Sequence, residues 1–370
     1  MVQLKTFFNN KLIKTISTDI KKVFTNFDTK GFENSCTKEL ENLELKERSI
    51  LVAKNLKEYL PNDYKKSISI ILNSMPEKVE DVEIESMKSF YFAPHAMFIE
   101  KFGLDHLEES LEGMLKITKV FTSEFTIRPF IEKYPKKMLK ILEEWAKDEN
   151  ENVRRLVSEG TRPRLPWAPK LSNFIEDPKP VIELLELLKE DSSLYVRRSV
   201  ANNLNDIAKD SPELVIKTLQ KWKNIENEGT QWLIKHASRT LVKNGNQDVL
   251  KLLGFGKCDN ILISNFSISP KNIKIGEELK FEFDIELKDE EEEDVDVMID
   301  YAVHYVKSNG KLNPKVFKLT KKVISKGNSI KIKKKQSFKK ITTRKYYKGK
   351  HFIEIIVNGE KMNKIEFNLD

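Results

Sequence analysis

Residues 194–206 read L-Y-V-R-R-S-V-A-N-N-L-N-D, and two related stretches flank them. E-N-V-R-R-L-V-S-E-G-T-R begins at Glu151 and Q-W-L-I-K-H-A-S-R-T-L-V-K begins at Gln231, so the pattern recurs about every 40 residues. Each stretch follows an acidic or polar turn and precedes a second helical segment, such as residues 212–223. Helix pairs that repeat in this way stack, bury one face and line a concave surface with the other. The pattern therefore predicts a HEAT-like helical repeat solenoid.

Helical spacing, with apolar residues three and four apart, extends from the start of the chain to about residue 256. Beyond it, segments such as I-L-I-S-N-F-S-I-S-P (261–270) and H-F-I-E-I-I-V (351–357) alternate or are rich in β-branched and aromatic residues. About seven such strands fit a small antiparallel sandwich. The sequence thus predicts a multidomain chain, with an all-α HEAT-like solenoid over residues 1–256 and a small all-β immunoglobulin-like sandwich over residues 257–370.

Charge is unevenly distributed along the chain, which carries 65 Lys and Arg against 57 Asp and Glu, a net charge of +8. Residues 277–300 are strongly acidic, whereas residues 301–350 hold 17 Lys or Arg and no Asp or Glu. A segregated basic surface favours a polyanion such as DNA, because release of the counterions on its phosphates drives a salt-sensitive affinity. The alternative is that the two blocks form facing strands whose charges pair with one another.

Several function classes lack their sequence signatures in this chain. Cys36 and Cys258 are the only cysteines and stand far apart, so they provide neither a disulfide framework nor a zinc site. The five histidines show no metal-ligand spacing, and no glycine-rich phosphate loop or G-x-S-x-G motif occurs. These absences argue against metalloenzymes, nucleotide hydrolases, serine hydrolases and redox enzymes. Because no apolar run could span a membrane and the N-terminus lacks a secretory signal pattern, we expect a cytoplasmic protein without a membrane partner.

The stretch S-E-G-T-R-P-R-L-P-W-A-P-K-L, residues 158–171, places Trp167 between Pro166 and Pro169. Proline fixes its own backbone angle, so this frame predicts a ring that is held in a defined direction. An aromatic face attracts cations and would suit a cationic nucleotide. The alternative is that Trp167 is an ordinary packing anchor.

Two carboxylates are candidates for chemistry. Asp206 follows Arg198 and Asn202 at successive i+4 spacings on one predicted helix, so these three side chains share a face. The alternative for Asp206 is a solvated helix face on which it pairs with a basic neighbour. Glu124 comes after two capping candidates, so it can be a first-turn carboxylate favoured by the helix dipole, and this role is compatible with a catalytic one if the helix end opens onto the groove.

Arginine pairs stand near the repeat ends, and guanidinium groups bind phosphate oxygens bidentately. Adjacent helical residues point about 100° apart, so we expect one arginine of each pair to face DNA and the other to tie neighbouring hairpins together. The predicted DNA-binding residues of the repeats are Arg154, Arg155, Arg162, Arg164, Arg197, Arg198 and Asn202. Those of the basic last domain are Lys333, Lys334, Lys335, Lys339, Lys340 and Arg344.

The blocks around Glu124, Trp167 and Asp206 together resemble the AlkC branch of the DNA alkylation-repair glycosylases. The resemblance is strongest from Pro94 to about Pro212 and extends to the immunoglobulin-like domain that one AlkC subgroup carries. It implies a base excision repair enzyme that removes cationic methylated bases from duplex DNA as a monomer, without cofactor or metal. It also implies that Glu124, Trp167 and Asp206 are catalytic and that Arg155 approaches the lesion.

The implied lesions are chiefly 3-methyladenine, with 3-methylcytosine as a second candidate, in the DNA of a bacterial nucleoid. A base alkylated at N3 is already cationic, so the carboxylates need only stabilise the oxocarbenium-like sugar and direct the attacking water. Asp206 is the first choice for that role, with Glu124 as its partner, and the lesion is not expected to enter a deep base-flipping pocket. The rival hypothesis is a non-enzymatic HEAT-repeat scaffold that binds protein or nucleic acid.

Overall fold

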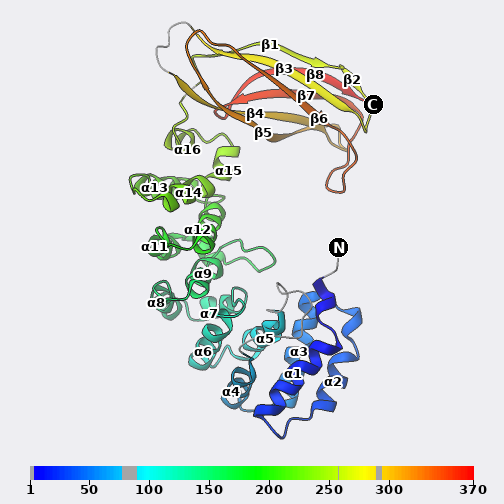
Figure 1. Cartoon of the computed structure of the whole chain (residues 1–370), viewed down its shortest axis with the longest axis vertical. Helices are drawn as coiled ribbons and strands as arrows, with labels where there is room; N and C mark the ends of the chain where they lie inside the picture. Colours follow the sequence, from blue (N-terminus) through cyan, green and yellow to red (C-terminus); the bar gives the residue numbers. More distant parts are fainter. Residues whose placement is uncertain (1–3, 77–89, 257, 289–293) are drawn as a thin grey trace. The chain divides into compact units, whose positions relative to one another are not determined.

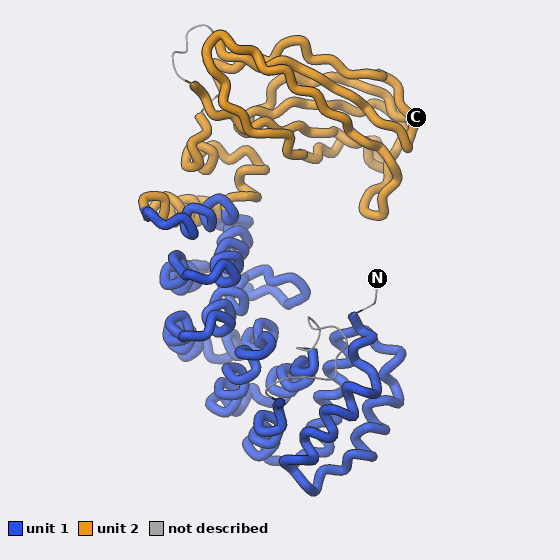
Figure 2. The backbone as a smooth tube through the Cα atoms, in the orientation of Figure 1, with its two compact units in different colours: residues 1–211, 225–237 blue, residues 212–224, 238–370 orange. Residues whose placement is uncertain are grey.

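A computed structural model describes residues 4–76, 90–256, 258–288 and 294–370 of the chain. These residues form two compact units, coloured separately in Figure 2. The first unit comprises Met1–Ser211 and Ile225–Ala237, and the second comprises Pro212–Asn224 and Ser238–Asp370. Each unit has its own core, and we describe them in turn.

The first unit is built from helices alone within the described residues (Figure 1). Its α-helices are α1 (Asn10–Val23), α2 (Thr29–Thr37), α3 (Leu45–Tyr59), α4 (Tyr64–Ser74), α5 (Ala93–Phe102), α6 (Leu107–Thr118), α7 (Ile127–Lys133), α8 (Pro135–Trp145), α9 (Glu151–Gly160), α10 (Ser172–Glu176), α11 (Lys179–Leu188), α12 (Leu194–Ile207) and α14 (Glu228–Ala237). Two short 3-10 helices, η1 (Leu4–Phe7) and η2 (Leu40–Asn42), complete it.

Polar residues at the helix starts explain several of these boundaries. The side chains of Asn9, Asp28, Asp63, Asn150 and Ser193 each accept a hydrogen bond from a backbone N–H in the first turn of the helix that follows. Such a cap satisfies a donor that has no partner inside the helix, and it is worth about 1 kcal/mol. The caps at Asn150 and Ser193 begin α9 and α12, the two helices that carry the candidate site.

Helices α9, α12 and α14 pack side by side, and α8 and α11 form a second layer against them (Figure 1). Helices α9 and α12 coincide with two of the related sequence stretches, and the third stretch covers the end of α14 and then α15 (Arg239–Lys243), so the predicted helical repeat is confirmed. The apolar positions of α9 and α12 lie three and four residues apart and are buried: Val153, Leu156, Val157, Val196, Val200 and Leu204. The repeat thus brings the polar faces of α9 and α12 next to one another.

The second unit contains a sandwich of two sheets. Its strands are β1 (Ile261–Ser269), β2 (Asn272–Ile273), β3 (Glu278–Leu287), β4 (Val295–Val306), β5 (Leu312–Ile324), β6 (Ile330–Ser337), β7 (Gly349–Val357) and β8 (Glu360–Leu369). One sheet has the order β1-β3-β6 and the other the order β2-β8-β7-β4-β5. The described residues thus hold one strand more than the roughly seven expected of such a sandwich, because the two-residue β2 pairs in parallel with β8.

A single apolar core joins the two sheets of the sandwich. Phe281 and Phe283 of β3 share it with Tyr301 of β4, Ile353 of β7 and Phe367 of β8. Large side chains from both sheets bury most of the apolar surface that stabilises such a domain. This core confirms the predicted all-β sandwich.

Three helices, α13 (Pro212–Trp222), α15 (Arg239–Lys243) and α16 (Gln247–Leu252), also belong to the second unit. Gly245 before α16 approaches Gly359 of the β7–β8 turn so closely that an added Cβ would lie 2.7 Å from the Gly359 carbonyl oxygen. Gln247 donates a hydrogen bond to the carbonyl oxygen of Asn358 at 3.3 Å. Helices therefore give way to strands between Leu252 and Ile261, while the predicted domain boundary at residue 256 stays a prediction.

None of the helices in the described residues is both long and apolar enough to cross a bilayer.

Candidate functional site

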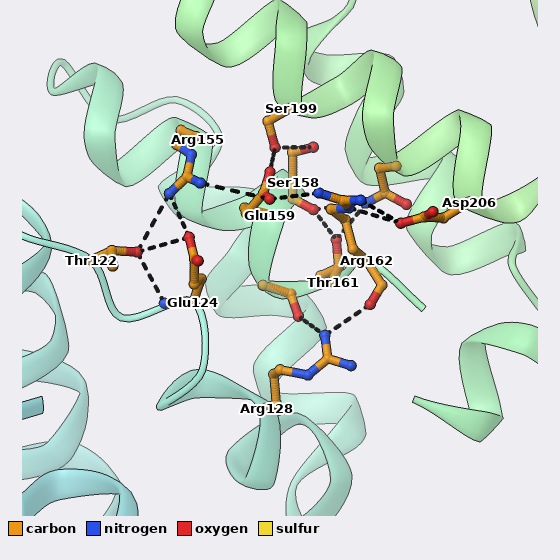
Figure 3. A network of polar contacts seen from close by, with 12 residues as sticks. Thr122, Glu124, Arg128, Arg155, Ser158, Glu159, Thr161, Arg162, Ser199 and Asp206 are labelled. Carbon is orange, nitrogen blue, oxygen red and sulfur yellow. Dashed lines mark hydrogen bonds and ion pairs between the residues drawn. The ribbon is translucent and has the colours of Figure 1, made fainter. Parts of the chain in front are cut away.

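A continuous chain of ion pairs links five side chains from α9, the loop after it, α12 and the loop before α7 (Figure 3). Arg155 Nη1 lies 2.7 Å from Glu124 Oε2, and Arg155 Nη2 lies 3.6 Å from Glu159 Oε1. The same Glu159 oxygen accepts a hydrogen bond from Arg162 Nη1 at 2.7 Å. Arg162 then donates from Nε and Nη2 to Asp206 Oδ2, both at 2.8 Å. We call these five residues the charge network; they bring together the two carboxylates predicted from the sequence.

Glu124 lies outside helix α7, which begins at Ile127. It is held by Thr122, whose hydroxyl donates to Glu124 Oε2 at 3.1 Å and accepts from the Glu124 backbone N–H at 3.3 Å. Arg155 also donates to the Thr122 hydroxyl at 3.4 Å. Because Glu124 is not in the first turn of a helix, the helix-dipole alternative is wrong, and its partner is the guanidinium group of Arg155.

The guanidinium group of Arg155 is fixed from two sides. Its Cζ lies 4.8 Å from the ring centroid of Tyr195 on α12, a cation–π contact in addition to the Glu124 ion pair. Burial disfavours the charged form, but the Glu124 and Glu159 carboxylates outweigh burial and hold the pKa of Arg155 above its usual value. Arg155 therefore stays a cation in the network, and Tyr195 is a site residue that sequence reasoning missed.

Asp206 is buried, with a side chain 4% exposed. Besides Arg162, it is contacted by Lys209 Nζ, which lies 2.8 Å from Oδ1. The predicted face of Arg198, Asn202 and Asp206 is therefore not uniform, since Arg198 is exposed while Asp206 points into the packing between α9 and α12. The alternative of a solvated face is correct in that Asp206 pairs with the nearby Lys209, but it is wrong about solvent, because Asp206 is buried.

Glu159 is a second site residue that reasoning from the sequence missed, although its spacing from Arg155 and Arg162 offered a signal. A glutamate four residues after one arginine and three before another lies within reach of both. Its second oxygen, Oε2, accepts a hydrogen bond from the Ser199 hydroxyl of α12 at 2.6 Å, and Ser199 also donates to the Ser158 hydroxyl at 3.0 Å. Glu159 is thus bound on every side by α9 and α12.

Trp167 lies in the loop between α9 and α10 and is 89% exposed. Its ring makes no cation–π or aromatic contact with another described residue, so the packing-anchor alternative is wrong. Its backbone φ of +65° is rare for a bulky side chain, and such strain costs about 1–3 kcal/mol. A large apolar ring held in solvent by a strained backbone is typical of a contact surface.

Arg128 of α7 holds this loop in place. Its Nη1 donates to the carbonyl oxygens of Gly160 at 3.0 Å and Arg162 at 2.8 Å, and its Nη2 donates to the Pro169 carbonyl at 2.6 Å. Burial lowers the pKa of Arg128 to about 10. Arg128 therefore connects the end of α9 with both ends of the loop that carries Trp167.

The two arginines of each pair differ in their contacts, and their predicted division into DNA-facing and hairpin-tying members stays a prediction. Arg154 forms a bidentate pair with Asp191, at 2.6 and 3.1 Å, and Arg197 donates to the Asp191 and Ser192 carbonyls. Arg154 therefore ties neighbouring hairpins together, Arg197 holds the turn before its own helix α12, and Arg198 is exposed.

Two further arginines predicted to bind DNA also have acidic partners. Arg164 forms a bidentate pair with Asp210, with both contacts at 2.7 Å, and Arg162 belongs to the charge network. Asn202 lies on α12, partly exposed. The DNA-binding roles assigned to the arginines and Asn202 stay predictions.

The lysines of the sandwich lie on and after β6, the edge strand of the three-stranded sheet. Lys333 is opposite Glu282 and Lys335 is opposite Lys280 on the outer face, while Lys334 is opposite the buried Phe281. Lys333 Nζ lies 3.4 Å from Glu282, and Lys331 Nζ lies 3.0 Å from it. Some basic and acidic strand residues therefore do pair; residues 289–293 of the acidic block lie outside the described residues.

Around Lys280 and Lys335 the outer face forms a hollow of about 530 Å³, lined also by Ser267 and Ser269. Among the described residues, neither Lys280 nor Lys335 has an ion-pair partner, and like charges directly opposite on neighbouring strands repel. Such a pair suits an anionic ligand.

Three other basic residues follow β6. Lys339 and Lys340 are exposed, and Arg344 is held against Tyr305, with its Cζ 4.3 Å from the ring centroid and Nη1 2.6 Å from the hydroxyl. Their DNA-binding roles stay predictions. Within the described residues, no group of three or more His, Cys, Asp or Glu could hold a metal ion.

Comparison with known proteins agrees with this architecture. A family model described as DNA alkylation repair enzyme matches residues 92–241, and one described as the C-terminal Ig-like domain of the uncharacterised protein YhaZ matches residues 262–370. The uncharacterized protein YhaZ of Bacillus subtilis (strain 168) is 38% identical over 370 residues, which is 100% of both chains. A solved structure of Pseudomonas fluorescens alkylpurine DNA glycosylase AlkC, bound to DNA containing an abasic site analog, is 35% identical, covers 100% of both chains and superposes with a TM-score of 0.89.

Proposed function

Because this chain belongs to the AlkC-type family of DNA alkylation repair glycosylases, we propose that it excises cationic N3-alkylated bases from duplex DNA. The proposed substrates are chiefly 3-methyladenine and secondly 3-methylcytosine, and the proposed reaction is hydrolysis of the glycosidic bond alone, without strand cleavage. The observation that carries this proposal is the likeness to an alkylpurine DNA glycosylase over the whole length of both chains.

The chemistry of the lesion explains why a site made of carboxylates would suffice. Alkylation at N3 of adenine gives the base a positive charge, so it leaves as a neutral molecule and needs no proton from the protein. The sugar left behind develops oxocarbenium character, and a carboxylate beside it stabilises that charge. A second carboxylate, or the same one, can orient the water that attacks C1′ and accept its proton.

We assign these roles to Asp206 and Glu124, the two ends of the charge network. Arg162 satisfies Asp206 Oδ2, so Asp206 retains its negative charge although it is buried. Its other oxygen, Oδ1, has Lys209 as partner, and that lysine side chain is 42% exposed. A DNA phosphate can therefore attract Lys209 away from Asp206 while the buried pair of Asp206 with Arg162 stays intact. When Lys209 leaves, Asp206 Oδ1 becomes available to the sugar.

Trp167 and the basic residues complete the proposed DNA contacts. The exposed Trp167 ring would lie against the sugar or the cationic base and exclude water there. Arg155, the exposed Arg198 and the sandwich lysines would contact the DNA backbone, which supplies affinity without reading sequence. We further propose that the duplex is gripped through its backbone and kinked, without drawing the lesion into a deep pocket.

The test is base release from methylated duplex DNA under single-turnover conditions. Asp206→Asn and Glu124→Gln remove a charge each with little change in shape, and each is expected to slow release about 100- to 1,000-fold, the usual range for loss of one electrostatic group. Glu143→Gln makes the same chemical change at an exposed position of α8 and should release base at the wild-type rate.

The outcomes separate enzyme from scaffold. Release by wild type that both variants match would overturn the catalytic assignment while leaving a glycosylase. No release by any protein, with DNA still bound, would favour the non-enzymatic scaffold that binds nucleic acid.

A further inference from the structure

Glu159 occupies the centre of the charge network, between the two arginines that hold the proposed catalytic carboxylates. One of its oxygens faces both Arg155 and Arg162, and the other accepts the Ser199 hydroxyl hydrogen bond. The Glu159 side chain is only 8% exposed, so it is not itself an evident contact for DNA. We infer that Glu159 is a positioning residue, which fixes Arg155 and Arg162 and so sets the charge and direction of Glu124 and Asp206.

The charges of the network show why the central carboxylate matters. Glu124, Glu159 and Asp206 carry three negative charges, and Arg155 and Arg162 carry two positive ones. The five groups have a net charge of −1, and Lys209 beside Asp206 balances it. Once a DNA phosphate attracts Lys209, as proposed above, the remaining charge of −1 favours a cation beside the network. Without the charge of Glu159 the same groups would be neutral, and the field at a developing oxocarbenium ion would weaken.

The same contacts also fix the positions of the Glu124 and Asp206 carboxylates. Arg162 now divides its donors between Glu159 and Asp206, and Arg155 divides its ion pairs between Glu124 and Glu159. When the shared partner is lost, each arginine is free to turn fully towards the carboxylate at its own end of the network. Each catalytic carboxylate would then be both more tightly neutralised and displaced from its present direction, and a displacement of about 1 Å can cost a rate factor of about 100.

The fold prepares this position before DNA binds. Glu159 stands in the last turn of α9, and Ser199 of α12 fixes its free oxygen across the helix interface. Asn203, also on α12, donates to the Ser158 carbonyl at 2.7 Å and to the Thr161 hydroxyl at 3.1 Å. These contacts lock the end of α9 to α12, so Glu159 is preorganised rather than recruited by substrate.

The inference rests on the proposed glycosylase activity, and the experiment measures rate and affinity separately. Glu159→Gln keeps the shape of the side chain and a hydrogen-bonding end for Ser199 and Arg162, but it removes the charge. We expect its single-turnover release of 3-methyladenine from methylated duplex DNA to be roughly 10- to 100-fold slower than wild type. Its affinity for duplex DNA with an abasic site analogue should be unchanged or higher, because the variant has one negative charge fewer facing a polyanion.

Three comparisons make the result decisive. Glu159→Asp keeps the charge on a shorter side chain and should recover part of the lost rate. Ser199→Ala should slow release by less than Glu159→Gln, because it frees one Glu159 oxygen but leaves the charge. Glu143→Gln, with the same charge change on exposed α8, should release base at the wild-type rate.

Base release by Glu159→Gln at the wild-type rate would overturn the inference. A parallel fall of release rate, DNA affinity and melting temperature would also overturn it, because that pattern indicates a structural role only. If Glu159→Gln does not fold, the Glu159→Asp rate decides in its place: a wild-type rate there shows that position does not matter. Absence of release by the wild-type protein would instead reject the proposed function itself.

Discussion

Trp167 combines three properties that seldom occur together at one residue: a large ring, a left-handed backbone and near-complete exposure to solvent. Residues that are held in a strained conformation by their surroundings cluster at functional sites, because there the strain serves a purpose. Here Arg128 supplies the constraint through three backbone carbonyls of the loop. Stability and function are therefore expected to respond in opposite ways to change at this residue.

Replacing Trp167 by glycine tests that expectation. Glycine adopts a positive φ without cost, so its relief of about 1–3 kcal/mol of strain offsets the flexibility that glycine adds to the unfolded chain. We predict a melting temperature equal to or above that of wild type, with base release slowed at least tenfold. Leu187→Ala, which removes another exposed apolar side chain, should leave release unchanged. A variant that loses stability but keeps full activity would show that the ring packs rather than binds.

For single residues, the sequence predicted only those features that depend on neighbouring positions in the chain. The proline frame indicated a fixed Trp167, but not that its ring would lie in solvent. The arginine spacing on either side of Glu159 could have identified its ion pairs, because three- and four-residue spacings bring helical side chains together. The pairing of Arg162 with Asp206 could not be predicted, since the two lie 44 residues apart and meet only through the packing of α9 on α12.

At the scale of elements, the repeat itself distributes the arginines. Arg154 and Arg197 occupy equivalent places in α9 and α12, and both bind groups of the turn that precedes a helix of the repeat. Their neighbours Arg155 and Arg198 point elsewhere because successive residues rotate about 100° around a helix. The repeat was predictable because apolar periodicity is local. Which arginine of a pair points inward depends on how each helix is rotated about its own axis. That rotation is set by packing between helices, so the sequence pattern does not reveal it.

The different contacts of Arg154 and Arg198 predict that substituting the first lowers stability and substituting the second weakens DNA binding. Arg154→Ala leaves Asp191, whose side chain is 5% exposed, without its bidentate partner, and loss of one member of a buried pair is expected to cost about 2 kcal/mol or more of unfolding free energy. Arg198→Ala should leave the melting temperature within about 1 °C of wild type, because exposed substitutions change stability little. It should instead weaken DNA binding and reduce the salt dependence by about one ion.

Thermal melting and DNA titrations at several salt concentrations measure both effects. Equal loss of stability in the two variants would contradict the assignment of Arg154 as the tie between hairpins. An unchanged salt dependence for Arg198→Ala would remove Arg198 from the DNA-binding surface.

At the scale of the whole molecule, the two architectures were predictable because each has its own periodicity, three to four residues in the helices and two in the strands. The grouping of α13, α15 and α16 with the sandwich could not be predicted from the sequence, because it depends on contacts such as that of Gly245 with Gly359. The basic character of residues 301–350 is also visible in the sequence, but strand register decides which lysines have an acidic partner.

Register gives a prediction for the sandwich. In full-length protein, replacing Lys280 and Lys335 together by glutamine should lower DNA affinity and reduce the salt dependence by about two ions, because neither lysine is neutralised by a carboxylate. Lys331→Gln is the matched control, since Lys331 already pairs with Glu282 and should contribute less. Filter binding with duplex DNA between low and moderate salt measures both. A loss of DNA affinity by Lys331→Gln that is half as large as that of the double substitution, or larger, would argue against direct phosphate contact by Lys280 and Lys335.

The central claim is that two carboxylates, the partly buried Glu124 and the buried Asp206, remove a cationic base while Arg155 and Arg162 hold them in place. Mass spectrometry of the bases freed from methylated duplex DNA, with excess enzyme and with no added metal or cofactor, measures this most directly. The account predicts free 3-methyladenine from the wild-type protein, an abasic site in the intact strand, and release at least 100-fold slower from Asp206→Asn. Free base in equal amounts from the wild-type protein and Asp206→Asn, or none from either above the spontaneous background, would contradict it.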